Sequence, residues 1–142
     1  MNDTELRAIA TRFRSALEIV GPASGAPGLR NFPKESCADT VLLLGAHLFD
    51  RGFGAFDGVG GEFGAPDSGE CHSHAWLECD GVIVDITADQ FPDVSQAVIV
   101  TRDDRWHRLF HISNRGIADF RRYGPDTAAQ LGPIYDRILD LL

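Results

Sequence analysis

The chain has 142 residues and a formal net charge of −8 at pH 7. Hydrophobic residues make up 44% of it and charged residues 24%, so we expect one domain over residues 1–142 with a real buried core. The acidic balance argues against broad binding to nucleic acids or to anionic membranes, because both need a basic surface. The chain has no run of about 18 apolar residues, so no membrane-spanning helix is predicted.

The expected compartment follows from the first residues and the cysteines. The N-terminus lacks the basic-then-apolar order of a signal peptide, and three cysteines do not make a disulfide framework. We therefore expect a reduced, cytoplasmic chain, with export by other routes left open. No Lys-Ser or Lys-Thr follows the glycines of residues 52–69, so a phosphate-cradling loop is not predicted and no cofactor is expected.

The N-terminal residues predict an amphipathic helix. Apolar residues recur at helical spacing, at Leu6, Ile9, Ala10, Phe13, Leu17 and Val20. Asp3 or Thr4 is expected to cap the helix at its N-terminus. The glycines and prolines of residues 21–28 are expected to break it and form a loop.

A second helix is predicted to begin at Cys37. Ser36 and Asp39 have the spacing of a capping box just before an apolar run, which makes Ser36 the N-cap. The residues from Val41 to Phe49 are apolar on nearly every side of a helix, and such a helix is buried. Gly52 is suited to end it.

The remaining residues predict strands and a last helix. Within residues 52–69, which hold seven glycines, we expect a short strand around 55–59 and otherwise a loop, either bordering a site or simply connecting. Strands are expected at 97–101 and 106–111 and a helical turn at 117–120. Pro133 is interpreted as the first residue of the final helix. The order of elements predicts an α+β domain with an antiparallel sheet.

The central motif is a predicted hairpin that turns at Asp80-Gly81, a strong hairpin signature between two β-rich runs. A two-residue turn opposes Cys79 to Val82 and Leu77 to Val84. It puts His74 and Asp85 on one face as diagonal neighbours, roughly 7–8 Å apart at the backbone and within side-chain reach. The other face is wholly apolar: Ala75, Leu77, Cys79, Val82, Val84 and Ile86.

These residues supply the parts of a thiol enzyme. A helix N-terminus and a nearby imidazolium both favour the thiolate form of a cysteine, so Cys37 is the candidate nucleophile. His74 is the candidate base, and Asp85 would orient it. The backbone N–H of Cys37 would bind the oxyanion, with Asn31 as a possible side-chain donor. Trp76 would shield the His74–Asp85 pair and, like Asn31, is a candidate for a substrate or oxyanion contact, while Cys71 and Cys79 are expected only to pack.

The pattern resembles a known family. A cysteine opening an apolar helix, then His74-Ala-Trp76 on one strand and Asp85-Ile-Thr87 on the next, is similar to the transglutaminase-like branch of the papain-like thiol enzymes. The resemblance covers about residues 30–90. It implies a central buried helix that carries the cysteine and packs against an antiparallel sheet, with helices at both ends of the chain. It also implies a thioacyl intermediate formed from a peptide or protein amide, as in peptidases, amidases, deamidases and protein crosslinkers.

Two other functions compete with this one. His72, His74 and Glu78 lie on one strand face with spacings that suit a divalent metal, as in cupin-type barrels. Alternatively, the chain keeps the fold without its chemistry and acts as a binding domain.

Overall fold

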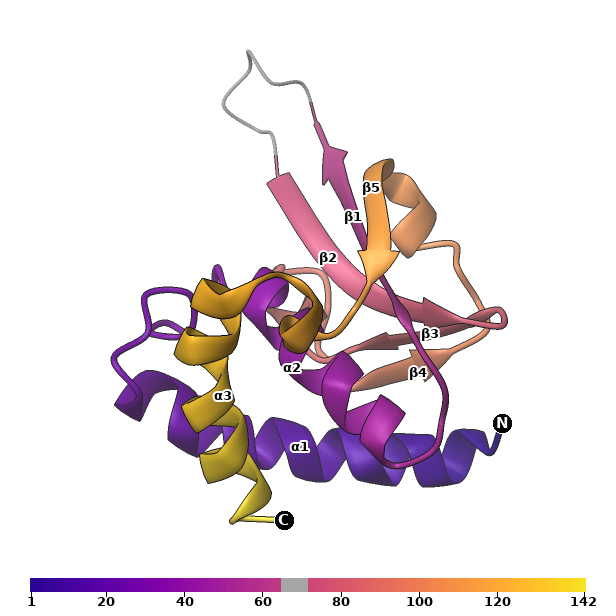
Figure 1. Ribbon diagram of the computed structural model, residues 1–142. Helices are drawn as coiled ribbons and strands as arrows, with labels where there is room; N and C mark the ends of the chain where they lie inside the picture. Colours follow the sequence, from indigo (N-terminus) through magenta and orange to yellow (C-terminus); the bar gives the residue numbers. More distant parts are fainter. Residues whose placement is uncertain (65–71) are drawn as a thin grey trace.

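The computed structural model describes residues 1–64 and 72–142, which form an α+β fold (Figure 1). The strands build a five-stranded antiparallel sheet in the order β4-β3-β2-β1-β5. The helices of these residues are α1 (Asp3–Ala23), α2 (Cys37–Asp50) and α3 (Pro125–Leu139), with short 3-10 turns η1 (Ala88–Gln90), η2 (His107–Leu109) and η3 (Phe120–Arg122). The strands are β1 (Asp57–Phe63), β2 (His72–Cys79), β3 (Val82–Asp85), β4 (Ile99–Thr101) and β5 (His111–Ile117).

Helix α1 confirms the predicted amphipathic helix, with both ends displaced. Its apolar stripe is buried, including Leu6, Phe13 and Leu17. The cap is Asn2, whose side chain accepts a hydrogen bond from the Glu5 N–H at 3.1 Å, so the predicted caps at Asp3 and Thr4 were wrong. The helix also runs through Pro22 to Ala23, so the loop expected from residue 21 begins only after Ala23.

Helix α2 begins at Cys37 with Ser36 as N-cap and is buried, as predicted. The predicted capping box is wrong: Ser36 makes no side-chain cap bond, because its hydroxyl donates to the Lys34 carbonyl at 3.0 Å. The Asp39 carboxylate lies against Gly28 instead. The helix ends before Gly52, which has a φ of +86°. It packs on β2 and β1 (Figure 1).

Much of the glycine-rich stretch is a strand. The strand expected around 55–59 is β1, which begins at Asp57 and continues to Phe63. Glycine at position 58 is required by the helix above it, because a Cβ there would meet the side chain of Val41. Residues 65–71, including Cys71, lie outside the described residues, so the predictions for that part of the loop and for Cys71 are untested.

The C-terminal half holds two further corrections. The strand predicted at 106–111 is the 3-10 turn η2, and the strand β5 begins only at His111. The last helix begins at Pro125 rather than Pro133, because Gly124, with a φ of +93°, forms the N-cap and Pro125 takes the first helical position. Strand β4 confirms the strand predicted at 97–101 in a shorter form, and η3 lies just after the turn predicted at 117–120.

The hairpin of β2 and β3 has the predicted register. Cys79 pairs with Val82 and Leu77 with Val84, and Asp80 and Gly81 both have positive φ, at +51° and +79°. Its two faces enter different clusters: Leu77, Val82, Val84 and Ile86 pack with the helices, whereas Trp76 and Ile83 pack with Val59 and Phe110. The sheet is therefore covered on both faces. Among the described residues, none of the helices has both the length and the apolar character to cross a membrane.

Candidate active site

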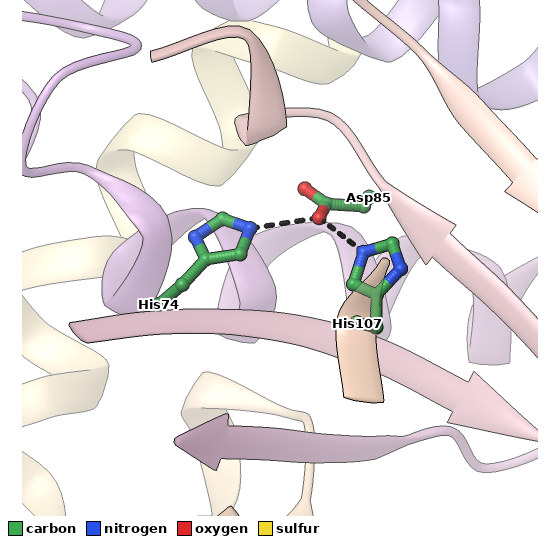
Figure 2. A group of neighbouring side chains, drawn as sticks. All are labelled: His74, Asp85 and His107. Atoms are coloured by element: carbon green, nitrogen blue, oxygen red, sulfur yellow. Dashed lines mark hydrogen bonds and ion pairs between the residues drawn. The ribbon is translucent and has the colours of Figure 1, made fainter. Parts of the chain in front are cut away.

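His74 and Asp85 form a buried hydrogen-bonded pair (Figure 2). The Nε2 atom of His74 lies 2.7 Å from Oδ2 of Asp85, and each residue is only 2% exposed. The other carboxylate oxygen of Asp85 accepts the backbone N–H of Thr87 at 3.0 Å. The hairpin brings the pair together as its register predicted: β2 carries the histidine, and the aspartate is the last residue of β3.

A second histidine, His107, binds the same carboxylate oxygen. Its Nε2 atom lies 2.7 Å from Oδ2 of Asp85, and the residue is buried (Figure 2). Sequence reasoning missed it, because the segment around it was interpreted as a strand with no link to the hairpin. The sequence offered only a weak signal for this contact. His107 lies among aromatic residues, between Trp106 and Phe110, and a buried aspartate such as Asp85 needs hydrogen-bond donors.

The electrostatics of this group favour an ionised carboxylate and a charged imidazole. Burial alone would raise the pKa of Asp85, but hydrogen bonds from His107 and His74 outweigh it and hold that pKa well below its usual range. Burial alone would lower the pKa of His74, but its hydrogen bonds to Asp85 and Cys37 outweigh it and raise the pKa to about 9. The imidazole is thus stabilised in its charged form.

Cys37 joins the group from the first position of α2. Its side chain is half-buried and lies close enough to the His74 imidazole to contribute, after Asp85, to the raised pKa of that histidine. The structure therefore brings Cys37, His74 and Asp85 together in one place. Since Nε2 of His74 is directed at Asp85, its Nδ1 atom is the one left for other partners.

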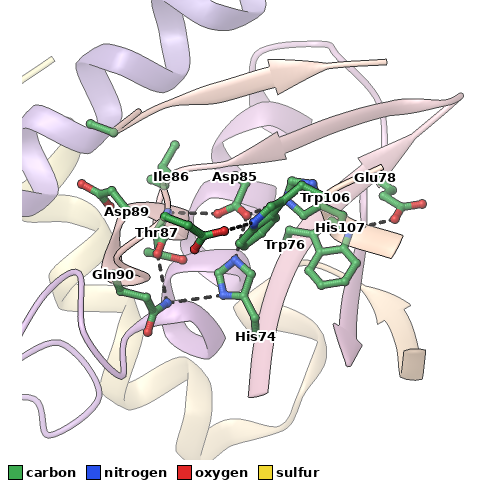
Figure 3. A network of polar contacts seen from close by, with 12 residues as sticks. His74, Trp76, Glu78, Asp85, Ile86, Thr87, Asp89, Gln90, Trp106 and His107 are labelled. Carbon is green, nitrogen blue, oxygen red and sulfur yellow. Dashed lines mark hydrogen bonds and ion pairs between the residues drawn. The ribbon is translucent and has the colours of Figure 1, made fainter. Parts of the chain in front are cut away.

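Gln90 is a further neighbour of His74 that the sequence did not reveal. Its side-chain amide nitrogen lies 3.3 Å from Nδ1 of His74 and donates to the Thr87 carbonyl at 3.0 Å (Figure 3). An amide N–H can donate only to an unprotonated ring nitrogen, so Gln90 donates to His74 only in the neutral form with its proton on Nε2, which a pKa of about 9 makes the minor form near neutral pH. That tautomer leaves a lone pair on Nδ1, as a base acting on a thiol needs.

Arg14 of α1 fixes the segment that follows Asp85. It is 7% exposed, donates to the Ile86 carbonyl at 2.7 Å, and binds both carboxylate oxygens of Asp89 at 2.7 and 2.9 Å. It also donates to the Ala97 carbonyl at 3.1 Å. The turn that carries Gln90 is therefore anchored to a helix more than seventy residues earlier in the chain.

Trp76 and Asn31 lie differently from what a substrate or oxyanion role would need. Trp76 is 1% exposed, and its indole N–H donates to Glu78 at 2.7 Å, so this donor is already engaged. Its ring lies 5.8 Å from that of His74 and 4.9 Å from that of His107, which matches the predicted shielding of the pair. Asn31 is exposed, and its backbone carbonyl accepts a bond from Lys34.

The metal-binding set expected on β2 is not assembled. His72 is exposed, and the Glu78 carboxylate binds Trp76 and Arg115. Within residues 1–64 and 72–142, the group with metal-ligand potential is His74, Asp85 and His107, whose candidate ligand atoms all lie within 4.8 Å of one another.

Comparison of the chain with protein-family models, with curated proteins and with solved structures finds no match.

Proposed function

We propose that this protein is a cysteine-dependent acyl-transfer enzyme that acts on an amide bond of a peptide or protein. The observation that carries the proposal is the group of Cys37, His74 and Asp85, in which a thiol at a helix N-terminus lies beside a buried imidazole held by a buried carboxylate. This arrangement supports a transglutaminase-like, papain-like core, in which a buried helix presents the cysteine to an antiparallel sheet.

The proposed reaction begins with the thiolate of Cys37. Its sulfur attacks the carbonyl carbon of the amide, and the amide oxygen takes up the electron pair of the carbonyl. The charged His74 then gives a proton to the amide nitrogen, and the C–N bond breaks to leave a thioester on Cys37. Water or an amine, deprotonated by His74, attacks the thioester and releases the acyl group, so the thiol is regenerated.

The start of α2 supports stabilisation of the oxyanion. The first backbone N–H groups of a helix have no partner within it, and they carry the positive end of the helix dipole. Ser36 does not cap them, since its hydroxyl donates backwards to Lys34. The N–H of Cys37 is thereby a suitable donor for negative charge that develops on the substrate oxygen.

His107 has a positioning role in this proposal. By donating to Oδ2 of Asp85, it holds the carboxylate ionised and fixed in place while His74 uses the same oxygen. An ionised, well-oriented carboxylate keeps the His74 proton on Nε2 and stabilises the imidazolium.

Metal binding is the second candidate, because the ligand atoms of His74, Asp85 and His107 cluster so closely. Their separations argue for hydrogen bonds instead. Ligands about 2.0–2.1 Å from a tetrahedral zinc ion lie roughly 3.3 Å apart, whereas both imidazole nitrogens lie 2.7 Å from Oδ2 of Asp85. Metal analysis of the purified protein decides between them: a stoichiometric metal that is lost in His107→Gln would favour this second candidate.

The test of the thiol-enzyme proposal is site-resolved alkylation. The protein is treated with limiting iodoacetamide near neutral pH, and adducts are mapped on all three cysteines by mass spectrometry. We expect Cys37 to react at least about tenfold faster than Cys79, because burial and the neighbouring Asp80 raise the pKa of the Cys79 thiol. His74→Gln should remove most of this advantage. If all three cysteines are labelled at equal rates, and His74→Gln does not change those rates, the result would instead favour a binding domain without catalytic activity.

A second measurement tests acyl transfer itself. Wild-type protein is incubated with glutamine-containing peptides, and intact mass is followed for a thioester adduct, with Cys37→Ser as the control. An adduct that hydroxylamine releases, and that Cys37→Ser does not form, would support the proposed intermediate.

A further inference from the structure

An apolar cavity lies beside His74, outside the group of residues that the proposed reaction uses. Its volume is about 340 Å³. The walls come from the end of β1, the start of β2, the segment after η1, and η2 with the residues on either side of it; the apolar lining residues are Phe63, Phe91, Pro92, Trp106, Leu109 and Phe110. Such a volume lies at the small end of the range for ligand pockets, which suits a single side chain better than a large ligand.

The cavity shares its wall with the candidate active site. The ring of His74 lies 5.1 Å from that of Phe91, 5.9 Å from that of Trp106 and 5.7 Å from that of Phe110, between ring centroids. Figure 3 shows the Trp106 indole and the Gln90 amide beside the His74 ring. Anything held against these rings therefore lies one aromatic layer away from His74, whose own side chain has no exposed surface.

Six of the eight lining residues are apolar, which favours an apolar occupant, and the two polar ones are His72 and Asp93. The Trp106 indole N–H already donates to Asp93 at 2.9 Å, so it is not free to bind a polar group. At the rim, Phe63 and Leu109 are 47% and 57% exposed. Large apolar side chains that stay exposed around a concave apolar surface are typical of a binding site, because covering them removes apolar area from water.

We propose that this pocket binds an aromatic or large aliphatic side chain of the peptide substrate, from a residue close to the amide that Cys37 attacks. The identity of the occupant as part of a peptide rests on the proposed function; the apolar preference rests on the pocket alone. The pocket then selects substrates by side chain, while the Cys37 and His74 pair performs the chemistry.

The test compares three electrophiles on the full-length chain. Iodoacetamide reports the intrinsic reactivity of Cys37, and the chloromethyl ketones of acetyl-phenylalanine and acetyl-alanine report the pocket. We expect the phenylalanine reagent to label Cys37 about tenfold to hundredfold faster than the alanine reagent, from the apolar area that the phenyl ring buries. Leu109→Ala, which shortens the rim without adding a charge, should reduce this preference, with the iodoacetamide rate of the same variant as the reference for both ketones. Leu141→Ala, at another exposed leucine (53%), is the matched control and should not change the preference.

The outcomes separate the two proposals. Selective iodoacetamide labelling of Cys37 with equal rates for the two ketones would overturn the pocket and leave the proposed function standing. If iodoacetamide shows no selectivity, the proposed function fails and the pocket is judged by binding alone. In Cys37→Ser, titration of acetyl-phenylalanine amide followed by nuclear magnetic resonance should then shift the Trp106 indole signal more than acetyl-alanine amide does, and Leu109→Ala should weaken the effect. Equal shifts would overturn the pocket.

Discussion

His107 donates to Asp85 across 2.7 Å, onto the oxygen that also binds His74. One buried carboxylate oxygen therefore holds two imidazoles, one from the hairpin and one from a 3-10 turn that follows the next strand. Asp85 is also held by the Thr87 N–H. This number of donors explains how a carboxylate can stay ionised with almost no contact with water.

Replacing His107 tests its positioning role. His107→Phe leaves Asp85 with one donor fewer, so we expect the pKa of Asp85 to rise and the free energy of unfolding to fall by about 1–3 kcal/mol. The alkylation rate of Cys37 should also fall, because His74 is held less firmly. His107→Gln keeps an N–H donor at a similar distance from the backbone, so it should retain most of the stability and most of the Cys37 alkylation rate. Urea unfolding and the pH profile of alkylation measure the two effects. A His107→Phe protein with the wild-type pH profile would reduce His107 to a packing residue.

The raised pKa of His74 makes stability depend on pH. Its pKa is about 9 in the folded protein against an ordinary 6.5, so between these values the folded state binds a proton that the unfolded state releases. The stabilisation is fully present below about pH 6.5 and is lost as pH rises through 9, on the order of 3 kcal/mol in total. Urea unfolding from pH 6 to 10, compared between wild type and His74→Gln, isolates this contribution. Parallel stability curves for the two proteins would contradict the assigned pKa.

Arg14 is expected to hold the turn that carries Gln90. Arg14→Met removes the bonds to Asp89 and to the Ile86 carbonyl, so stability should fall by roughly 3 kcal/mol or more. Arg102→Met is the matched control, because Arg102 also forms an ion pair that involves α1. Its partner is Asp3 of that helix, and both side chains are largely exposed, at 55% and 42%. That loss should stay within about 1 kcal/mol. Similar losses in the two variants, measured by urea unfolding, would count against an anchoring role for Arg14.

Two glycines on helices should respond to alanine very differently. A Cβ at Gly45 of α2 would overlap the backbone carbonyl of Ala118, whereas one at Gly132 of α3 would meet nothing within 4 Å apart from its chain neighbours, one of which is Pro133. Gly45→Ala should therefore cost about 1–3 kcal/mol through overpacking, despite the better helix propensity of alanine. Gly132→Ala should change stability by less than about 1 kcal/mol, because the contact of the new Cβ with the Pro133 ring offsets the gain in helix propensity. Thermal unfolding of both variants checks the contrast, and a stabilised Gly45→Ala would show that α2 does not pack this closely on Ala118.

The sequence by itself determined the features that obey local rules. The Asp80-Gly81 turn set the register of the hairpin, because two successive positive φ values favour these residues and a two-residue turn leaves one pairing. Alternation along β2 and β3 then divided the side chains between two faces and put His74 near Asp85. The start of α2 at Cys37 followed from the apolar run behind it.

Only the tertiary structure decided which distant side chains complete the group around Asp85. His107 reaches Asp85, and Arg14 reaches the turn after it, from segments whose local patterns carry no record of the contact, and Gln90 on that turn reaches back to His74. The failed capping box at Ser36 has the same cause, since its hydroxyl binds Lys34 and Asp39 lies against Gly28. Turn and strand preferences act over a few residues, whereas a buried carboxylate is satisfied by whichever donors the packed chain brings to it.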